Sequence, residues 1–158
     1  MIPITYLVGD ATKPQVEGNK IITHICNDIG KWGRRFVLAV SKLDPEAEWT
    51  YWRCYNHKQN HELGDIQIVP SWKTPETWIV NMIAQRGVMT TTSRAPIRYD
   101  ALQHCLNKLA VCSNAYDASV HMPRIGCGLA GGTWDKVEPL IEQELSARDT
   151  AVYVYDLA

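Results

Sequence analysis

The sequence has little net charge, no long apolar run and no closely spaced cysteine pair, and each absence excludes a class of protein. Its 16 basic and 17 acidic residues leave a formal net charge of −1, so we expect no extended nucleic-acid surface. No apolar stretch reaches the roughly 20 residues that a transmembrane helix needs, so we expect no membrane partner. The five cysteines are scattered without CxxC spacing, which argues against a disulfide framework and a zinc site. We therefore expect reduced thiols and a cytoplasmic protein.

The chain is long enough for one domain with a sizeable core. Its 158 residues are 46% hydrophobic and 21% charged, which is ordinary for a globular protein. No internal repeat, low-complexity segment or linker divides the sequence. The first ten residues, MIPITYLVGD, read as a strand because they lack the basic segment and the cleavage motif of a signal peptide. We expect a single domain over residues 1–158 and a monomer.

The hydrophobic pattern alternates between apolar strands and amphipathic helices. Residues 20–26, KIITHIC, form a β-branched apolar run that is typical of a buried strand. In residues 99–115 the apolar positions recur at a spacing near 3.6, which predicts an amphipathic helix. The expected strands are residues 4–8, 20–26, 65–69, 78–83, 119–123 and 151–155, and the expected helices are 34–42, 46–57, 99–115 and 134–145. This order predicts an α/β fold, a three-layer α/β/α sandwich around a central mixed, mostly parallel sheet.

Two glycine-rich loops each stand between an expected strand and an expected helix. The first is GKWGRRF at residues 30–36, and the second lies within HMPRIGCGLAGGTW at residues 121–134. Glycines let backbone N–H groups approach a phosphate closely, and a helix N-terminus adds unpaired donors and partial positive charge. A single loop of this kind can be a simple turn. Because ligands of α/β sheets bind at the carboxyl ends of strands, two such loops indicate a nucleotide-like ligand held from both sides.

Polar residues beside these loops have both a functional and a structural interpretation. Asp10, after the first strand, either accepts hydrogen bonds from an adenine amino group or stabilises its own turn. His24 lies mid-strand, where a histidine is usually packed in the core, yet near a substrate it can act as an acid or a base. Asn27 either holds a ribose hydroxyl or ends the strand. Arg34 and Arg35 either clamp a diphosphate or cover the first turn of a helix.

The remaining histidine and cysteine side chains give weaker indications. His57 and His61 have the i, i+4 spacing of a helical metal pair, but no third ligand of suitable type accompanies them. Cys127, inside the second glycine loop, would need a neighbouring base to act as a nucleophile, so we expect it to pack under the loop. We expect neither a metal nor another cofactor.

Four segments carry a resemblance to a known family: VGDAT at 8–12, THICNDIGKWG at 23–33, MPRIGCGLAGGTW at 122–134 and VYVYDL at 152–157. Together they resemble the macrodomain family, whose members bind ADP-ribose. The resemblance covers essentially the whole chain in the family's order of elements, and MPRIGCGL followed shortly by Trp is its most specific part. Within the family the chain is similar to the branch of terminal ADP-ribose protein glycohydrolase and the fungal ADP-ribose-1''-phosphate phosphatase, the THICN segment especially to the phosphatase.

The resemblance implies where the adenine end of the ligand would lie. Asp10, which follows Gly9, would hold the adenine amino group, and Ala11 would contact the adenine through its backbone. Tyr155 or Asp156, at the end of the last strand, would border the adenine pocket.

The resemblance also implies the position of the rest of the ligand. Residues 33–36 and 125–130 would enclose the diphosphate and the distal ribose, and Asn27 would lie near that ribose. His24 matches a histidine implicated in the phosphatase members. The candidate ligand-binding residues are Gly9, Asp10, Ala11, Asn27, Gly33, Arg34, Arg35, Phe36, Pro123, Ile125, Gly126, Cys127, Gly128, Leu129, Ala130, Tyr155 and Asp156, and the candidate catalytic residues are Asn27 and His24.

The sequence departs from that branch at three positions. Where the glycohydrolases have a catalytic lysine, Gln85 stands and provides no amine. Where they have an aspartate directly after GCGL, Ala130 has no acid–base capacity. Arg35 replaces a usual glycine, and would clamp the diphosphate, gate the cleft or obstruct it. The first two departures argue against a lysine–aspartate glycohydrolase mechanism.

Two functions therefore remain open. The first is metal-independent hydrolysis of an ADP-ribose derivative, such as ADP-ribose-1''-phosphate or an ADP-ribosyl ester, in which positioning and electrostatics supply much of the acceleration. The second is a reader that recognises ADP-ribose on protein or nucleic acid without chemistry. The missing lysine and aspartate support the reader directly.

Overall fold

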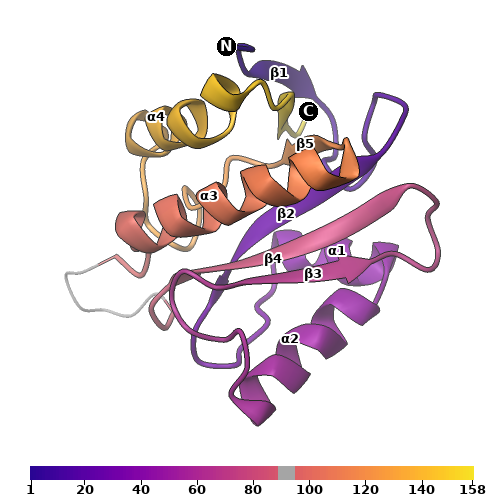
Figure 1. The fold of residues 1–158 in the computed structure, drawn as a ribbon. Coiled ribbons are helices and arrows are strands. Elements are labelled where there is room, and N and C mark those ends of the chain that lie inside the picture. The colour runs from indigo at the N-terminus through magenta and orange to yellow at the C-terminus, as the bar shows by residue number, and fades with distance from the viewer. Residues whose placement is uncertain (89–94) are drawn as a thin grey trace.

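The computed structural model describes residues 1–88 and 95–158 and is built around one six-stranded sheet (Figure 1). The strand order across the sheet is β1 (Thr5–Val8), β6 (Val152–Asp156), β5 (Ser119–Met122), β2 (Lys20–Asn27), β4 (Thr77–Gln85) and β3 (Ile66–Pro70). All neighbouring strands are parallel except β3 and β4, which are antiparallel. The carboxyl ends of the parallel strands therefore meet at one edge of the sheet.

Helices cover both faces of this sheet. The flanking elements are α1 (Phe36–Leu43) and α2 (Glu46–His57) on one face, and α3 (Tyr99–Tyr116), α4 (Trp134–Glu144) and the short helix η1 (Ser146–Arg148) on the other. Alternate residues of β4 supply both layers, because successive side chains of a strand point to opposite faces. Ile79 and Ile83 pack in the cluster with α1 and α2, whereas Val80 and Met82 pack with α3 and α4. The predicted three-layer α/β/α sandwich is confirmed.

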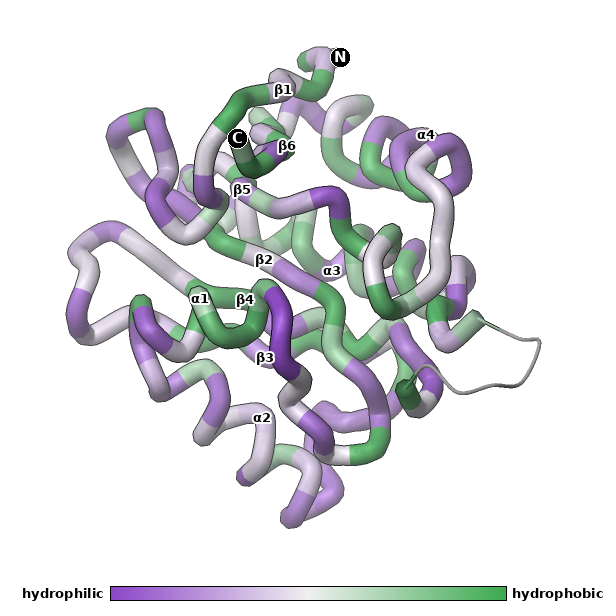
Figure 2. Tube along the Cα trace, turned by 180° about the vertical axis from the view of Figure 1, so that it is seen from behind, coloured by the Kyte–Doolittle hydropathy of each residue, from purple (hydrophilic) through white to green (hydrophobic). Residues whose placement is uncertain are grey.

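The hydropathy of the helices fits their positions. In Figure 2 the tube of α2 is largely purple and white, as suits a helix with much of its surface in solvent. On α2 only Ala47 and Tyr51 are buried. On α3 the buried positions include Leu102, Leu106 and Leu109, which recur at the helical spacing that the sequence predicts. No described helix is long and apolar enough to cross a membrane.

The start of α1 differs from the sequence prediction in a way that affects the site. We expected a helix from Arg34, but α1 begins at Phe36. Gly33 has φ of +99°, and Arg35 has φ −111° and ψ −108°, so the backbone ahead of Phe36 is not helical. Arg34 and Arg35 therefore belong to a loop rather than to the first turn of a helix.

Asp44, between α1 and α2, ties the start of α2 to the loop between β3 and β4. One carboxylate oxygen accepts from the Glu46 backbone N–H at 3.0 Å. The other accepts from the Ser71 hydroxyl at 3.0 Å and from the Trp72 backbone N–H at 3.0 Å. Burial alone would raise the pKa of the Asp44 carboxyl, but these hydrogen bonds outweigh burial and lower the pKa. The ionised form of Asp44 therefore stabilises the fold.

We predict that Asp44→Asn lowers the free energy of unfolding at pH 7 by about 2 kcal/mol, because charged acceptors are lost. Since the folded-state pKa is lowered, the contribution of the carboxylate is present above the unfolded pKa and disappears as the pH falls through the folded pKa. Urea unfolding of both proteins from pH 7 into the acid range, with exposed Glu17→Ala as control, measures the difference. A difference that stays constant below pH 4 would contradict this role.

Candidate functional site

A cavity of about 600 Å³ opens at the carboxyl ends of β2, β4 and β5. The loop after β2 forms one wall and the glycine-rich loop after β5 forms the other, as the sequence predicts for two opposed loops. The candidate residues that line it are His24, Asn27, Gly33, Arg34, Arg35, Phe36, Pro123, Ile125, Gly126, Gly128, Leu129 and Ala130. Its lining also includes Ile25, Cys26, Lys31, Trp32, Val37, Gln85, Val88 and Arg124. Gly9, Asp10, Ala11, Cys127, Tyr155 and Asp156 do not line it.

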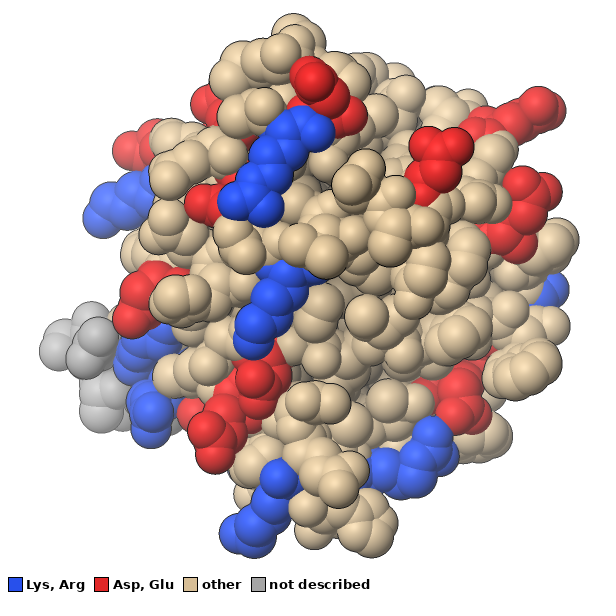
Figure 3. Space-filling view, viewed as in Figure 1, with Lys and Arg blue, Asp and Glu red and all other residues tan. Residues whose placement is uncertain are grey.

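The described lining is cationic, although the whole chain has a formal net charge of only −1. Its charged side chains are Lys31, Arg34, Arg35 and Arg124, and no described lining residue is an aspartate or a glutamate. On the face drawn in Figure 3, by contrast, acidic and basic side chains are interspersed. Positive charge is thus concentrated where a ligand would enter, which favours an anionic ligand.

The glycine-rich loop after β5 is folded tightly against the core. Gly126 has φ of +75°, and a Cβ built on it would lie 2.4 Å from Ile97 Cδ1 and 3.2 Å from Ile25 Cδ1. The Gly132 N–H donates to the Gly126 carbonyl at 2.7 Å. Between these two glycines, the backbone N–H groups of Gly128 and Leu129 donate to no described protein acceptor. These unpaired donors border the cavity, as a phosphate cradle requires.

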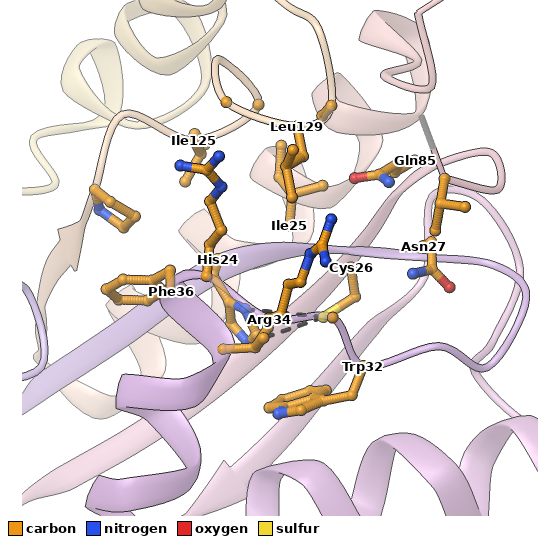
Figure 4. A pocket seen from close by; sticks show the side chains of 18 of the residues that line it. His24, Ile25, Cys26, Asn27, Trp32, Arg34, Phe36, Gln85, Ile125 and Leu129 are labelled. Atoms are coloured by element: carbon orange, nitrogen blue, oxygen red, sulfur yellow. Dashed lines mark hydrogen bonds between the residues drawn. The ribbon is translucent and has the colours of Figure 1, made fainter. Parts of the chain in front are cut away.

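His24 is both a core residue and part of the cavity lining. Its side chain is only 3% exposed, and its Nε2 lies 2.6 Å from Oδ1 of Asn81. The imidazole ring packs against Trp32 and Phe36, with ring centroids 5.3 and 5.9 Å away (Figure 4). Burial lowers the pKa of His24 to about 4. At neutral pH the imidazole is therefore uncharged and has no acidic proton to give.

Asn27 uses most of its side-chain amide to hold the loop that follows β2. Its Oδ1 accepts from the backbone N–H groups of Ile29 at 3.1 Å and Lys31 at 3.3 Å. The Tyr51 hydroxyl lies 2.6 Å from the same oxygen, and Nδ2 donates to the Lys31 carbonyl. One hydrogen of Nδ2 remains for a ligand in the cavity, toward which Figure 4 shows the side chain.

The residues expected at the adenine end lie together at the ends of β1 and β6, next to the cavity. The Gly9 N–H donates to the Asp156 carbonyl at 2.8 Å. One oxygen of Asp10 accepts from the backbone N–H and the hydroxyl of Thr12, at 2.8 and 2.7 Å, so Asp10 does stabilise its own turn. Tyr155 is 3% exposed, and its hydroxyl accepts from the Gln15 N–H. Asp156 is therefore the residue of the last pair that faces solvent.

Arg124 bridges the cavity and the end of β6, a contact that the sequence reasoning missed. Its guanidinium donates two hydrogen bonds to the carboxylate of Asp156, at 2.7 and 2.9 Å. These hydrogen bonds lower the pKa of Asp156. The same group lies 5.2 Å from the ring centroid of Tyr6 and 5.1 Å from that of Trp134. The bridge thus joins a residue of the cavity lining to the end of β6.

Most of the chain, including both walls of the cavity, matches a known protein family. Residues 23–141 match the model of the Macro domain. The chain belongs to the Macro domain family. The matched segment contains both loops that form the cavity walls.

Solved structures share this macrodomain fold. The chain is 47% identical to a protein of unknown function from Bacteroides thetaiotaomicron, over 99% of both chains and with a TM-score of 0.94. It is 45% identical to a macrodomain protein from Streptomyces coelicolor, over 98% of this chain and 99% of that one, with a TM-score of 0.86. At 18% identity it shares the fold of Thermosipho africanus DarTG in complex with ADP-ribose, with a TM-score of 0.70 over 89% of this chain and 38% of that one.

Two relatives of named function also match this macrodomain. Mouse chromodomain-helicase-DNA-binding protein 1-like is 28% identical over 96% of this chain, which spans only 17% of that protein's length. An ADP-ribose 1''-phosphate phosphatase from Lodderomyces elongisporus is 24% identical over 97% of this chain and 99% of its own length.

The other candidate side chains, His57, His61 and Cys127, form no metal site among the described residues. His57 ends α2, and Lys58 with φ of 55° turns the chain away, so His57 and His61 are not a pair on one helix. No described group of three or more His, Cys, Asp or Glu side chains could hold a metal ion. The half-buried Cys127 thiol lies 3.4 Å from the Ile125 carbonyl, and burial raises the pKa of that thiol.

The two positions at which the sequence departs from the glycohydrolases carry uncharged groups. Gln85 pairs in the sheet with Asn27 and donates from Nε2 to the Gly87 carbonyl at 2.8 Å. Ala130 is buried, and its carbonyl accepts from the Ile97 N–H at 3.0 Å. Both line the cavity, so its lining carries neither an ammonium nor a carboxylate at these two places.

We predict that Gly126→Ala destabilises the protein by about 2 kcal/mol, because the methyl group meets Ile97 and the positive φ disfavours alanine. Gly128→Ala is the matched control in the same loop, since its Cβ would meet nothing within 4 Å. We expect that control to stay within about 0.5 kcal/mol of the wild type. Urea unfolding followed by tryptophan fluorescence measures both, and equal stability of the two variants would refute the tight packing of Gly126.

Proposed function

We propose that this macrodomain binds ADP-ribose or an ADP-ribose derivative in the cavity between the two loops. The observation that carries the proposal is the cationic lining: Lys31, Arg34 and Arg35 have no described carboxylate partner, while Arg124 is paired with Asp156 outside the lining. A diphosphate placed there would receive unpaired N–H groups from the loop after β5 and guanidinium groups from the other wall. The volume of about 600 Å³ is in the usual range for sites of small ligands.

In the proposed orientation the distal ribose lies inside the cavity and the adenine lies beside it, toward the ends of β1 and β6. The distal ribose would lie by Asn27 and Gln85, where the walls carry uncharged amides. The adenine would lie toward Asp10, whose carboxylate has one oxygen engaged by Thr12 and a second available for an amino group. Arg124 lines the cavity and is paired with Asp156 at the end of β6, so in this orientation the adenine would lie against that pair.

The activity that we propose is metal-independent hydrolysis of the bond at the distal ribose, as in ADP-ribose-1''-phosphate or an ADP-ribosyl ester. The similarity to a named ADP-ribose 1''-phosphate phosphatase over nearly the full length of both chains supports it. Water would supply the hydroxyl group, and a phosphate of the ligand itself would take the proton. Asn27 would orient the distal ribose, because positioning and electrostatics can provide much of the rate acceleration.

A reader without chemistry is the second candidate. It is favoured by Gln85 and Ala130, which offer neither an acid nor a base, and by the absence of any carboxylate from the described lining. A reader would bind ADP-ribose on protein or nucleic acid and release nothing. Incubation with ADP-ribose-1''-phosphate and with ADP-ribosylated protein separates the two functions, because only a hydrolase liberates phosphate or ADP-ribose.

We predict that calorimetry gives a micromolar dissociation constant for ADP-ribose, about −8 kcal/mol, and weaker binding of AMP and ATP. Arg34→Ala should weaken ADP-ribose binding about tenfold, because a guanidinium contact with the diphosphate is lost. Exposed Lys42→Ala, at the far end of α1, is the control and should bind like the wild type. Binding by Arg35→Gly but not by the wild type would show that Arg35 obstructs the cavity. Absence of binding by both would refute the proposal.

We predict that Asn27→Ala lowers turnover of ADP-ribose-1''-phosphate by about 100-fold, because the amide both orients the ribose and holds the loop after β2. Tyr51→Phe removes only the hydroxyl beside Oδ1 and should cause a much smaller loss. Phosphate release under single-turnover conditions measures both variants. Unchanged turnover of Asn27→Ala would remove that residue from the mechanism, and no release by the wild type would favour the reader.

A further inference from the structure

A row of buried hydrogen bonds crosses the sheet below the cavity. His24 on β2, Asn81 on β4 and Gln67 on β3 lie at the same level, since His24 pairs with Asn81 and Asn81 pairs with Gln67 in the strand register. They are 3%, 0% and 3% exposed. His24 Nε2 lies 2.6 Å from Asn81 Oδ1, Asn81 Nδ2 lies 3.1 Å from Gln67 Oε1, and Gln67 Nε2 lies 2.8 Å from the Asn60 carbonyl.

The direction of each hydrogen bond in this row follows from two backbone carbonyls, which can only accept. Asn81 Nδ2 lies 3.1 Å from the Ala47 carbonyl, so the amide nitrogen of Asn81 must point there. Likewise the amide nitrogen of Gln67 must face the Asn60 carbonyl, which leaves Gln67 Oε1 to accept from Asn81. The carbonyl oxygen of Asn81 is therefore the atom that faces His24, and it can only accept.

We propose that Asn81 is a positioning residue that holds His24 in the tautomer with the proton on Nε2, and so keeps Nδ1 as a hydrogen-bond acceptor in the cavity lining. Burial of the ring, which lowers the pKa of His24 to about 4, keeps this tautomer neutral at pH 7. The Cys26 sulfur lies 3.9 Å from Nδ1 and 3.8 Å from Nε2, and burial raises the pKa of that thiol, so it stays protonated and does not compete as an acceptor.

The inference rests on the proposed function and specifies which group of the ligand lies next to His24. An acceptor nitrogen repels phosphate oxygens and attracts O–H groups, so the ligand group next to His24 is a ribose hydroxyl or a bound water rather than a phosphate. His24 then orients an O–H group and does not donate a proton. Trp32 and Phe36, which pack on the ring, keep bulk water from replacing that contact. The charged side chains of the described lining, Lys31, Arg34, Arg35 and Arg124, are all hydrogen-bond donors, so none of them competes with Nδ1 as an acceptor.

Nuclear magnetic resonance of ¹⁵N-histidine-labelled protein tests the tautomer directly and needs no ligand. In the wild type at pH 7 we expect the His24 correlations of a neutral ring with a proton on Nε2 and none on Nδ1. A proton on Nδ1 would overturn the inference even if ADP-ribose binds. If the wild type binds no ADP-ribose, the proposed function fails while the tautomer spectrum still decides the role of Asn81.

The variant Asn81→Leu removes the acceptor while keeping the size of the side chain. We expect it to lose the single Nε2-protonated tautomer and to weaken ADP-ribose affinity or turnover about tenfold, the effect of one lost hydrogen bond. Asp44→Asn, which destabilises the same face of the sheet without touching the cavity, should leave both the tautomer and the affinity unchanged. A folded Asn81→Leu protein with the wild-type tautomer and wild-type affinity would overturn the inference. If Asn81→Leu does not fold, the wild-type spectrum alone decides.

Discussion

The parallel pairing of β2 with both β4 and β5 is the constraint on which the whole site depends. Parallel pairing sends the loops after these strands to the same edge of the sheet, where they face each other across the cavity. The irregularity of register between Cys26 and Asn27 ends the regular strand at the point where the amide of Asn27 begins to organise the loop. The apolar clusters on both faces hold the strands in this alignment and reach the cavity lining at Trp32 and Ile125, so core packing also fixes the shape of the cavity.

The buried polar side chains of the row below the cavity, His24, Asn81 and Gln67, are tolerated because each has a hydrogen-bond partner. Burying an amide or imidazole without a hydrogen bond would cost about 1–3 kcal/mol on the scale of protein mutations. Asn81 meets this requirement with three partners, on β2, on β3 and at the start of α2. The same contacts fix the orientation of the Asn81 amide. The hydrogen bonds that stabilise this buried amide therefore also determine which nitrogen of His24 carries the proton. The same hydrogen bonds of Asn81 thus serve both the stability of the fold and the protonation of His24.

The sequence predicted what is local and missed what depends on pairing between distant segments. Strand and helix periodicity and the two glycine loops were sufficient for the layers, the sheet and the walls of the cavity. The partner of His24 was not predictable, because its pairing with Asn81 depends on the register of two strands 57 positions apart. Arg124 stood inside a recognised motif, yet its contact with Asp156 also joins distant segments. The start of α1 at Phe36 was missed because local backbone angles around Gly33 outweigh helix propensity.

A cationic cavity without a carboxylate also constrains how any hydrolysis would proceed. Basic side chains that would bind the diphosphate in the substrate and in the transition state alike would give uniform binding, which improves affinity without increasing kcat. Catalysis would then come from groups at the proposed place of the distal ribose, where the described lining holds the amides of Asn27 and Gln85 and the neutral ring of His24. None of these can exchange a proton readily at pH 7. The proton must therefore go to water or to the phosphate of the ligand itself, which makes a substrate that carries its own phosphate at the distal ribose the best match to this cavity.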